Sequence, residues 1–491
     1  MTEATTTGID ALATVLRTVL GPARVISDRQ ELRTYECDGL AHYRVVPALV
    51  AFPHTAAECA AVVRACAEAG VPFVARGSGT GLSGGALPHA DGVLVVTSQM
   101  RRILAVAPED ERAVVEPGVI NLDVTRAAAP HGYYYAPDPS SQQICSIGGN
   151  VAENSGGAHC LKYGFTTNHV TGAQIVTADG DLVRLGGRAP DPPGYDLLGA
   201  FVGSEGTLGI ATEVTVRLLR RPESVRTLLA AFATTDEAGA ATSAIIGAGI
   251  VPAAIEMMDA LAIEAAEAAV HCDYPAGAGA VLIVELDGPA AEVDAQFARA
   301  ERFCNDSGAF EIRIAADDVE RALFWKGRKS AFAAVGRISP DYIVQDGVVP
   351  RTALPDVLRR IAEMSRDTGV RVANVFHAGD GNLHPLVLFD EAVPGEAERA
   401  EEVSGAILDL CLEYGGSITG EHGVGMDKAK HMPRMFADAD LDTMQLVRCA
   451  FDPRGLSNPG KVFPTPRLCG EVPGRHKGAH PLQEAGVAEI F

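Results

Sequence analysis

The spacing of apolar and polar positions predicts helices and strands in alternation through the first half of the chain. Thr55 and Glu58 form a capping-box pattern ahead of an alanine-rich helix that Gly70 ends, and residues 71–75 predict a strand directly after it. Apolar runs predict further strands at 103–106, 113–116 and 212–218, and Asn121 is expected to cap another helix.

A second pattern begins after residue 222, where longer amphipathic segments alternate with apolar runs. Helices are expected at 235–249, 258–270, 290–305, 317–335, from about 354, and at 396–414, with strands at 280–286, 310–314, 341–348 and 370–376. This order predicts an α+β layer domain built on a covered antiparallel sheet.

A glycine-rich run, PFVARGSGTGLSGGA at 72–86, interrupts the first pattern. Gly79, Gly81 and Gly84 match the dinucleotide pattern G-x-G-x-x-G, but that pattern needs a helix directly afterwards. Here the glycines lead through Pro88 to the strand-like residues 93–97, so a Rossmann unit is not expected. Glycines can still bring backbone N–H groups close to a pyrophosphate, although a simple tight turn is the alternative.

Two more clusters of small residues follow. Residues 138–164 read DPSSQQICSIGGNVAENSGGAHCLKYG, and residues 203–210 read GSEGTLGI. Small and turn-forming residues suit a wall on which a large planar ligand lies. The three clusters together predict one extended nucleotide site.

The composition excludes several classes of protein. The chain of 491 residues has a formal net charge of −22, which argues against a nucleic-acid partner because such binding requires basic residues. Its N-terminus lacks a basic signal region, and no apolar run of about 18 residues occurs, so we expect no transmembrane segment and a cytoplasmic location. The cysteines form no C-x-x-C pair, which argues against an iron–sulfur cluster within this chain.

A candidate metal site lies in the second half. In FHAGDGNLHPLVLF, His377 and His384 flank a turn at Asp380 and Gly381, so a hairpin would bring the two imidazoles together. Two solvated histidines are the alternative for the pair alone. Glu421, in SITGEHGVG, adds a carboxylate and favours a catalytic divalent site for zinc, with manganese or iron as alternatives.

Neighbouring residues suggest acid–base chemistry on a carboxylate substrate. His422 could remove a proton from a metal-bound hydroxyl group, and a structural role is its alternative. The segment FWKGRKSAFAAVGR offers Arg328, Lys329 and Arg337 as cations for a substrate carboxylate. Arginine suits this role best because its guanidinium can bind both carboxylate oxygens, and an exposed basic helix face is the alternative for Lys329.

Taken together, these motifs resemble the FAD-linked oxidases of the vanillyl-alcohol oxidase, or PCMH-type, fold. The resemblance extends over about residues 15–465 and is strongest to the flavin subunit of glycolate oxidase and to D-2-hydroxyacid dehydrogenases such as D-lactate dehydrogenase. It implies an FAD-binding domain at 1–222, a substrate or cap domain with the metal site at 223–440, and a segment at 441–491 that returns to the FAD domain.

The resemblance also implies roles for individual residues. His377, His384 and Glu421 match the metal ligands, His422 the general base, Arg328 the arginine that binds the substrate carboxylate, and Asn382 a polar substrate contact. FAD is expected at Arg76, Gly77, Ser78, Gly79, Thr80, Gly81, Leu82, Ser83, Asp138, Gly148, Gly149, Asn150, Gly156, Gly157, Glu205, Ile210 and Asn458. The first loop has no histidine for covalent attachment, so noncovalent FAD is implied.

The activity implied is oxidation of glycolate or D-lactate to the 2-oxo acid, with hydride transfer to the flavin. Relatives that act on hydroxy-diacids carry a lysine shortly before the position of Asp346, whereas this chain reads IVQDG, which disfavours 2-hydroxyglutarate. A second flavin-binding subunit and an iron–sulfur subunit are implied partners, which would place the protein at the inner membrane face.

Three alternatives remain at this point. The first is a stand-alone D-lactate or other D-2-hydroxyacid dehydrogenase. The second is a metal-dependent hydrolase that acts on a nucleotide. The third is a non-catalytic flavin-binding subunit, which the complete set of candidate site residues disfavours.

Overall fold

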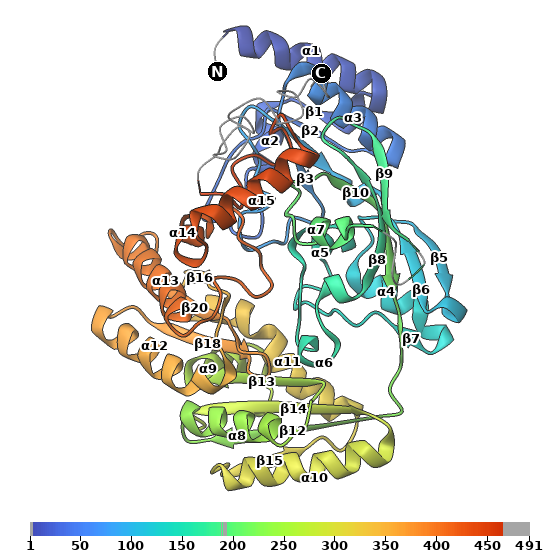
Figure 1. Ribbon diagram of the computed structural model, residues 1–491. Coiled ribbons are helices and arrows are strands. Elements are labelled where there is room, and N and C mark those ends of the chain that lie inside the picture. The colour runs from blue at the N-terminus through green and yellow to red at the C-terminus, as the bar shows by residue number, and fades with distance from the viewer. Residues whose placement is uncertain (1–2, 188, 190–193, 465–491) are drawn as a thin grey trace, which may run out of the picture.

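The protein forms two units, one above the other in Figure 1, with the first part of the chain in the upper unit. The computed structural model describes residues 3–187, 189 and 194–464. The expected C-terminal segment at 441–491 is therefore described as far as residue 464, and its remainder lies outside the described residues. Helix α15 (Asp438–Phe451), drawn in red, runs back from the lower unit beside the upper one (Figure 1).

The upper unit contains two main sheets. The first has four strands in the order β1-β2-β4-β3, in which β2 and β3 both run parallel to β4, and the second has five antiparallel strands in the order β5-β6-β10-β8-β9. A short pair, β7 and β11, lies apart. The strands are β1 (Val25–Ile26), β2 (Leu49–Ala51), β3 (Phe73–Arg76), β4 (Val93–Val96), β5 (Ile103–Ala107), β6 (Arg112–Val115), β7 (Tyr133–Tyr134), β8 (Val170–Val176), β9 (Leu182–Gly186), β10 (Ile210–Arg217) and β11 (Leu219–Arg220).

Helices of this unit pack on the sheets and on the segments that join them. They are α1 (Glu3–Leu20), α2 (Arg29–Leu32), α3 (Ala56–Ala69), α4 (Asn121–Ala128), α5 (Ile147–Glu153), α6 (Cys160–Tyr163) and α7 (Leu197–Phe201). As predicted, Thr55 caps α3 by accepting a hydrogen bond from the Glu58 amide, and Gly70 ends it in the left-handed conformation. The connection from β3 to β4 contains no helix in the described residues 77–92, which confirms that this glycine run does not open a Rossmann helix.

The upper sheet is completed by a distant part of the chain. Phe73 of β3 forms a bridge with Ser457, its N–H donates to the Leu456 carbonyl (2.9 Å), and its carbonyl accepts from the Asn458 N–H (2.8 Å). Residues 456–458 therefore act as an additional edge beside β3.

The lower unit is built on one nine-stranded sheet. Its main path is β15-β12-β14-β13-β18-β19-β17, and β20 joins β18 to β16. All of its pairings are antiparallel. The strands are β12 (Ser224–Phe232), β13 (Ala254–Asp259), β14 (Ala280–Gly288), β15 (Glu311–Ile314), β16 (Asp341–Val344), β17 (Gly347–Val348), β18 (Val372–His377), β19 (Asn382–Leu383) and β20 (Pro385–Phe389).

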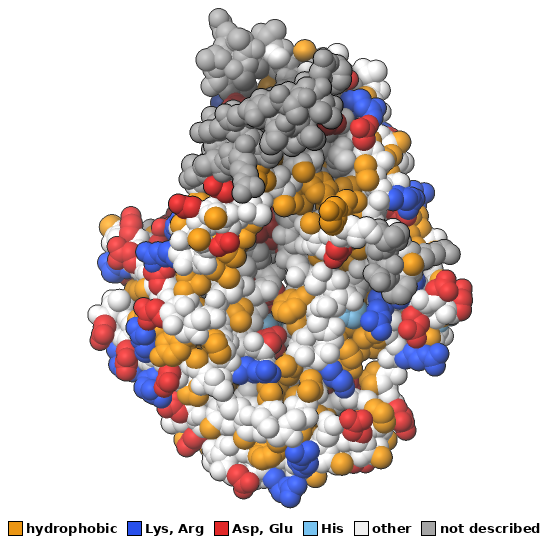
Figure 2. All heavy atoms as spheres, viewed as in Figure 1, with side chains coloured by type: hydrophobic (Ala, Val, Ile, Leu, Met, Phe, Trp, Pro, Cys, Tyr) orange, Lys and Arg blue, Asp and Glu red, His pale blue; other side chains and the backbone are white. Residues whose placement is uncertain are grey.

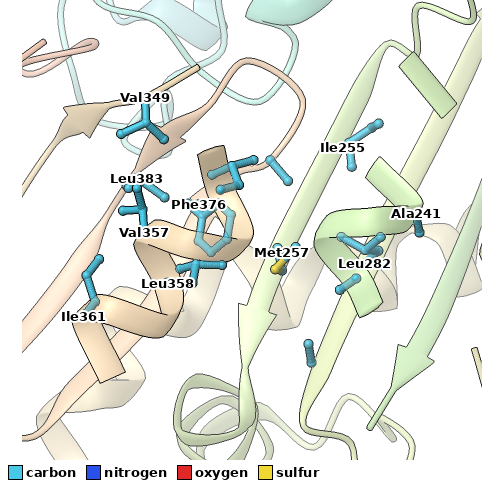
Figure 3. Close-up of a cluster of buried hydrophobic side chains, with 14 of the residues drawn as sticks. Ala241, Ile255, Met257, Leu282, Val349, Val357, Leu358, Ile361, Phe376 and Leu383 are labelled. Atoms are coloured by element: carbon cyan, nitrogen blue, oxygen red, sulfur yellow. The ribbon is translucent and has the colours of Figure 1, made fainter. Parts of the chain in front are cut away.

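Helices cover both faces of this sheet. The helices are α8 (Thr235–Gly247), α9 (Ala260–Val270), α10 (Ala290–Asp306), α11 (Asp318–Ala334), α12 (Leu354–Thr368), α13 (Glu396–Glu413) and α14 (Met432–Met435). Helices α8, α10, α12 and α13 pack on one face, in the core around Met257, Leu282 and Phe376 that Figure 3 shows. Helices α9 and α11 pack on the other face, against Leu229 and Ile283.

Burial on both faces explains why some strands were not predicted. Strands β12 and β13 are almost continuously apolar, because alternate residues enter the two different cores. The expected helix at 258–270 is preceded by β13 and begins only at Ala260. The expected strand at 341–348 is divided into β16 and β17, with Gln345 and Asp346 between them.

The prediction that Asn121 caps a helix is wrong. Asn121 is the first residue of α4, and its buried side chain donates instead to the Pro137 carbonyl (3.1 Å) and to Asn150 Oδ1 (2.9 Å). Asn121 thus ties α4 to the start of α5.

Acidic and basic side chains are interspersed on the face of the molecule shown in Figure 2. With a net charge of −22, the surface as a whole repels polyanions.

Candidate active site

A cavity of about 830 Å³ is lined by residues of both units. Its upper wall consists of the glycine run, the start of α5 and the segment before β10. Its lower end is formed by residues that include Phe332, Tyr342, Glu421 and His422. The cavity therefore joins the glycine-rich loops to two of the residues expected to carry chemistry.

Most of the predicted flavin residues lie in the wall of this cavity. They are Arg76, Gly77, Ser78, Gly79, Thr80, Gly81, Leu82, Gly148, Gly149, Asn150, Glu205 and Ile210.

Glycine is required in this wall because the backbone approaches neighbouring groups closely. A Cβ atom at Gly77 would collide with Ser146 Oγ, and one at Gly148 would lie 2.7 Å from Pro117 Cβ. Because no side chain projects at the glycine positions, the backbone there is open to a flat nucleotide cofactor.

The remaining predicted flavin residues, Ser83, Asp138, Gly156, Gly157 and Asn458, lie outside the lining of the cavity. The Asp138 carboxylate is 2.9 Å from His159 Nδ1. Asn458 Nδ2 donates to the Gly85 carbonyl (2.8 Å) and to the Glu205 carbonyl (2.6 Å). In this structure Asn458 fixes the wall of the cavity, so a direct cofactor contact by these residues stays a prediction.

His377, His384 and Glu421 come together although they lie on separate segments. His377 ends β18, His384 lies between β19 and β20, and Glu421 lies in the loop after α13. Each histidine Nε2 is 3.3 Å from Glu421 Oε1. Ligand atoms of a tetrahedral site with metal bonds of about 2.0–2.2 Å are separated by about this distance.

Their buried polar atoms also fit a metal. Both ring nitrogens of His384 and Oε2 of Glu421 are buried without a hydrogen-bond partner among the described residues. Buried polar atoms of this kind normally have a partner, and a divalent cation would supply one. Burial raises the pKa of Glu421, but the surrounding histidines, His377 first, lower it to about 2, so the group is a carboxylate at neutral pH.

The hairpin differs in register from the simplest expectation. His377 pairs across the strands with Asn382 rather than with His384. The two imidazoles nevertheless lie close, with ring centroids 5.1 Å apart. In the same register His384 lies opposite Val375, whose N–H donates to the His384 carbonyl (3.4 Å), and Val375 precedes His377 by two residues, so both histidines are on one face of the sheet.

Arg328 lies beside this trio through a shared carboxylate. Glu256 Oε1 is 2.6 Å from His377 Nδ1, and Glu256 Oε2 is 2.7 Å from Arg328 Nε. Arg328 is 2% exposed, and its Nη2 has no hydrogen-bond partner among the described residues; the same is true of Asn382 Oδ1. Neither residue is among those that line the cavity, so their contact with a substrate stays a prediction.

The other candidate cations differ from Arg328. Lys329 lines the cavity and is exposed, with its ammonium group 5.7 Å from the Trp325 ring. Arg337 donates to the Ala268 carbonyl at 2.6 Å. Of the three candidates, Arg328 is the one that shares a carboxylate with His377.

His422 lines the cavity beside the trio. Its ring stacks on His384, with centroids 4.9 Å apart and an angle of 3° between the planes. Burial lowers the pKa of His422 to about 4, an effect that the nearby Asp346 carboxylate only partly offsets. The imidazole is therefore neutral near pH 7 and able to accept a proton.

Three further residues organise this region: Glu256, Asp346 and His159. Their roles in the site were not predicted from the sequence. Asp346 accepts hydrogen bonds from the loop that carries Glu421 and His422, and His159 joins Asp138 to Glu285 of the lower unit. One signal was available, because Glu256 is a lone carboxylate within the apolar run AAIEMM at 253–258. The partners of Asp346 and His159 are too distant in sequence to give such a signal.

The fold and the site together define a class, a two-unit oxidoreductase in which a nucleotide-cofactor cavity ends beside histidines and a carboxylate. Residues 47–186 match the FAD binding domain, and residues 221–462 match the FAD linked oxidases, C-terminal domain. The chain belongs to the FAD-linked oxidases, and it is a flavin-dependent enzyme.

Curated relatives match over nearly the whole chain. Glycolate oxidase subunit GlcD of Escherichia coli K12 is 52% identical over 452 residues, which cover 92% of this chain and 91% of the relative. Glycolate oxidase subunit GlcD of Bacillus subtilis is 39% identical over 91% of this chain and 95% of the relative. A D-lactate dehydrogenase of Anaerostipes hadrus is 29% identical over 90% of this chain and 95% of the relative.

Solved structures show the same fold at low identity. The 4-ethylphenol oxidase from Gulosibacter chungangensis has a TM-score of 0.78 at 17% identity, covering 94% of this chain and 98% of its own. p-Cresol methylhydroxylase has a TM-score of 0.78 at 16% identity, covering 94% of this chain and 97% of its own. The predicted α+β, PCMH-type fold is confirmed, and the flavin family sets the hydrolase alternative aside. Among the described residues, the helices are too short or too polar to cross a membrane.

Proposed function

We propose that this enzyme oxidises a short 2-hydroxy acid, glycolate or D-lactate, to the 2-oxo acid as the flavin subunit of a glycolate oxidase. The arrangement of Arg328, the trio of His377, His384 and Glu421, and the neutral His422 at one end of the flavin cavity carries this proposal. The relatives named glycolate oxidase subunit and D-lactate dehydrogenase support the same substrate class. A stand-alone D-lactate dehydrogenase is the alternative within that class.

Each residue has a role that follows from its environment. Arg328 Nη2 binds the substrate carboxylate, and Asn382 Oδ1 accepts a hydrogen bond from the substrate. His377, His384 and Glu421 would hold a divalent cation, zinc before manganese or iron, which makes a bound hydroxyl group more acidic. A ring nitrogen of His422 accepts the hydroxyl proton. Noncovalent FAD supplies the hydride acceptor when bound.

The wall near these residues favours a small substrate. Phe332, Tyr342, Val344 and Phe389 line this part of the cavity. A second carboxylate placed against these apolar side chains would lose its hydration, and the cation that lines the same cavity near Phe332 is the exposed Lys329. The same wall accommodates the hydrogen of glycolate or the methyl group of D-lactate.

We further propose that electrons leave through partner subunits. The relatives are named as subunits of glycolate oxidase. The sequence has no C-x-x-C pair, so a second flavin-binding subunit and an iron–sulfur subunit would carry electrons onward. Such partners would bring the protein to the inner face of the membrane.

The proposal is tested by anaerobic loss of the oxidised flavin absorbance on adding glycolate, D-lactate, L-lactate or D-2-hydroxyglutarate separately. Bleaching by glycolate or D-lactate is the expected result. Arg328→Lys keeps the charge but loses the planar guanidinium, and it should raise the substrate concentration needed for bleaching at least tenfold. Flavin that none of these acids bleaches would argue against the substrate class.

Metal dependence needs a separate measurement. Dialysis against a chelator should leave the flavin spectrum intact while stopping reduction by substrate, and added zinc, manganese or iron should restore it. Full reduction of the metal-free enzyme would exclude the role assigned to the trio.

A further inference from the structure

The loop at 419–422, which carries Glu421 and His422, is held by one buried carboxylate. Asp346 Oδ2 accepts hydrogen bonds from Thr419 Oγ1 (2.6 Å), from the Gly420 N–H (3.0 Å) and from the His422 N–H (2.8 Å). The Glu421 N–H lies 3.2 Å from both Asp346 oxygens. Consecutive amides thus converge on a single side chain.

This arrangement is buried. Asp346 is 0% exposed, and Lys428, which donates to Asp346 Oδ2 at 3.2 Å, is 1% exposed. A buried N–H group must have a partner, and this loop has no helix or strand to provide one. The Gly420 N–H also lies 3.0 Å from the Asp346 main-chain carbonyl, whereas the Glu421 and His422 amides are directed at the Asp346 side chain. Hydrogen bonds to a carboxylate are shorter and stronger than those between neutral groups, so Asp346 is an effective anchor for the loop.

The position of Asp346 follows from the sheet. It lies in the break between β16 and β17, and the next strand, β17, is bridged to Ser417 through Val348. The sheet therefore fixes Asp346, and Asp346 fixes the loop. After this loop, the next amides are held by the upper unit: Glu205 accepts from the Val424 N–H (2.7 Å) and the Gly425 N–H (2.6 Å). Each unit thus holds one part of the segment at 420–425.

We propose that Asp346 is a positioning residue that sets the metal ligand Glu421 and the base His422 by binding their backbone amides. This inference rests on the proposed function, because it assumes that the trio binds a divalent cation. Asp346 Oδ2 is occupied by the donors described above, so Asp346 acts on Glu421 and His422 through the loop. Its Oδ1 lies 3.4 Å from His384 Nε2, and the test must therefore separate positioning from direct ligation.

The test uses purified enzyme with FAD bound and metal removed, titrated with cobalt(II) as the probe. Asp346→Asn keeps the size of the side chain but replaces an acceptor oxygen with an N–H donor that faces the loop amides. We expect a cobalt dissociation constant at least tenfold higher, a comparable loss of kcat at saturating cobalt, and an unchanged ratio of flavin to protein.

Asp259→Asn is the matched control. Asp259 is a largely buried carboxylate at the end of β13 in the same unit, and it accepts from the Ala262 N–H (3.0 Å), the Asn374 N–H (2.8 Å) and Asn374 Nδ2 (2.9 Å). Its replacement should lower the melting temperature to a similar extent and leave the cobalt dissociation constant within twofold of wild type. A fall in cobalt affinity equal to that of Asp346→Asn would mean that general destabilisation explains both, which overturns the positioning role.

A second variant, which also replaces Lys428, tests the same proposal and can be used if Asp346→Asn alone does not fold. The double variant Asp346→Asn/Lys428→Met leaves no unpaired buried ammonium group, and it should bind cobalt as weakly as Asp346→Asn. Recovery of wild-type affinity in the double variant would show that Asp346 serves only as a counterion for Lys428, which overturns the proposal.

Cobalt absorption bands separate positioning from ligation. At saturating cobalt the visible bands of Asp346→Asn should keep their wavelengths, because the set of ligands is unchanged. Shifted bands would make Asp346 itself a ligand and overturn the proposal. A wild-type protein that binds no divalent metal contradicts the proposed function, whereas equal cobalt affinity of wild type and Asp346→Asn contradicts only this inference.

Discussion

At the scale of single residues, Glu256 links His377 of the trio to Arg328, the two parts of the site that we propose act on one substrate. Its two oxygens contact His377 and Arg328 separately, and it is 1% exposed. The contact with Nδ1 of His377 fixes the ring so that Nε2 faces Glu421. A carboxylate that orients a metal-binding histidine in this way also raises the basicity of that histidine.

We predict that Glu256→Gln impairs metal and substrate binding together. The glutamine amide keeps one acceptor oxygen, but it has no negative charge to balance Arg328. Its NH₂ group would also face one of the two partners of Glu256, His377 or Arg328, both of which donate to residue 256. The cobalt dissociation constant and the KM for hydroxy acid should each rise about tenfold or more, measured by titration and by steady-state kinetics with an artificial electron acceptor. Asp259→Asn, on the same strand, should change neither by more than twofold. A rise in only one of the two constants would show that Glu256 does not couple the metal ligand to the arginine.

The sequence predicted the residues with chemical signatures and missed those that orient them. His377, His384, Glu421 and His422 lie in short glycine-flanked motifs whose residue types indicate their chemistry. Glu256 lies in a strand that was not predicted, because residues 254–259 are buried on both faces and lack the alternation of a surface strand. Its role depends on pairing with β18, which is more than a hundred residues away.

At the scale of elements, helix α11 carries Arg328, for which we propose a substrate-binding role, and it is held by the upper unit. Trp325 stacks on His159, with ring centroids 5.7 Å apart, and Trp325 Nε1 donates to Glu285 Oε2 at 2.8 Å. Arg321 also donates to Glu285 at 2.7 Å, and His159 lies between Glu285 and Asp138. Positions 321, 325 and 328 share one face of the helix. The contacts of Arg321 and Trp325 therefore fix where Arg328 lies along the helix axis and in which direction its side chain leaves the helix.

We predict that His159→Gln destabilises the enzyme in a pH-dependent manner. Burial lowers the pKa of His159, but the neighbouring carboxylates of Asp138 and Glu285 raise it by a larger amount. The pKa in the folded protein is about 10, above the unfolded value of about 6.5. The charged imidazole therefore stabilises the fold fully below about pH 6.5, and this contribution declines as the pH rises toward 10. The melting-temperature difference from wild type should be largest near pH 6, equivalent to about 2 kcal/mol, and should shrink at higher pH.

The exposed His131 provides the control for this prediction. His131→Gln should leave the melting temperature unchanged across the same pH range. A constant difference between wild type and His159→Gln from pH 6 to pH 10 would mean that His159 is not charged in the folded protein.

The limits of α11 were predicted closely, at 317–335 against an observed Asp318–Ala334. Its apolar spacing and acidic first turn are local features, so sequence alone defines them. The residues that contact the polar face of α11 lie far from it in the sequence. His159 had been read as part of a nucleotide wall, and only the packing of the two units brings it against Trp325 and Glu285.

At the scale of the whole molecule, the flavin cavity belongs to neither unit alone. Its wall comes from the glycine-rich loops above and from Phe332, Tyr342 and His422 below. A cofactor bound there contacts both units, and its binding energy adds to the stability of their contact.

We predict that free FAD raises the melting temperature of flavin-depleted enzyme in a concentration-dependent manner. At a concentration about 100 times its dissociation constant, a ligand that binds only the folded state stabilises it by about 2.7 kcal/mol. NAD shares the adenosine and pyrophosphate but lacks the flavin ring, and it should give a much smaller shift in differential scanning fluorimetry. Equal shifts with the two cofactors would mean that the lower part of the cavity does not recognise the flavin ring.

The overall class of fold was predictable because each glycine cluster and each histidine motif is local. How the units meet was not, since the contacts that join them are single residues such as Asn458 and Glu205, whose partners are set by tertiary packing.

The bridge between Phe73 and Ser457 has a consequence for biosynthesis. A ribosome makes β3 early, yet the backbone groups beside Phe73, and the Asn458 side chain that ties Gly85 to Glu205, arrive only after the entire lower unit has been translated. Until then the nascent upper unit lacks the backbone partners of Phe73 and the hydrogen bonds that fix the cavity wall, so we expect FAD to bind only after both units have been translated.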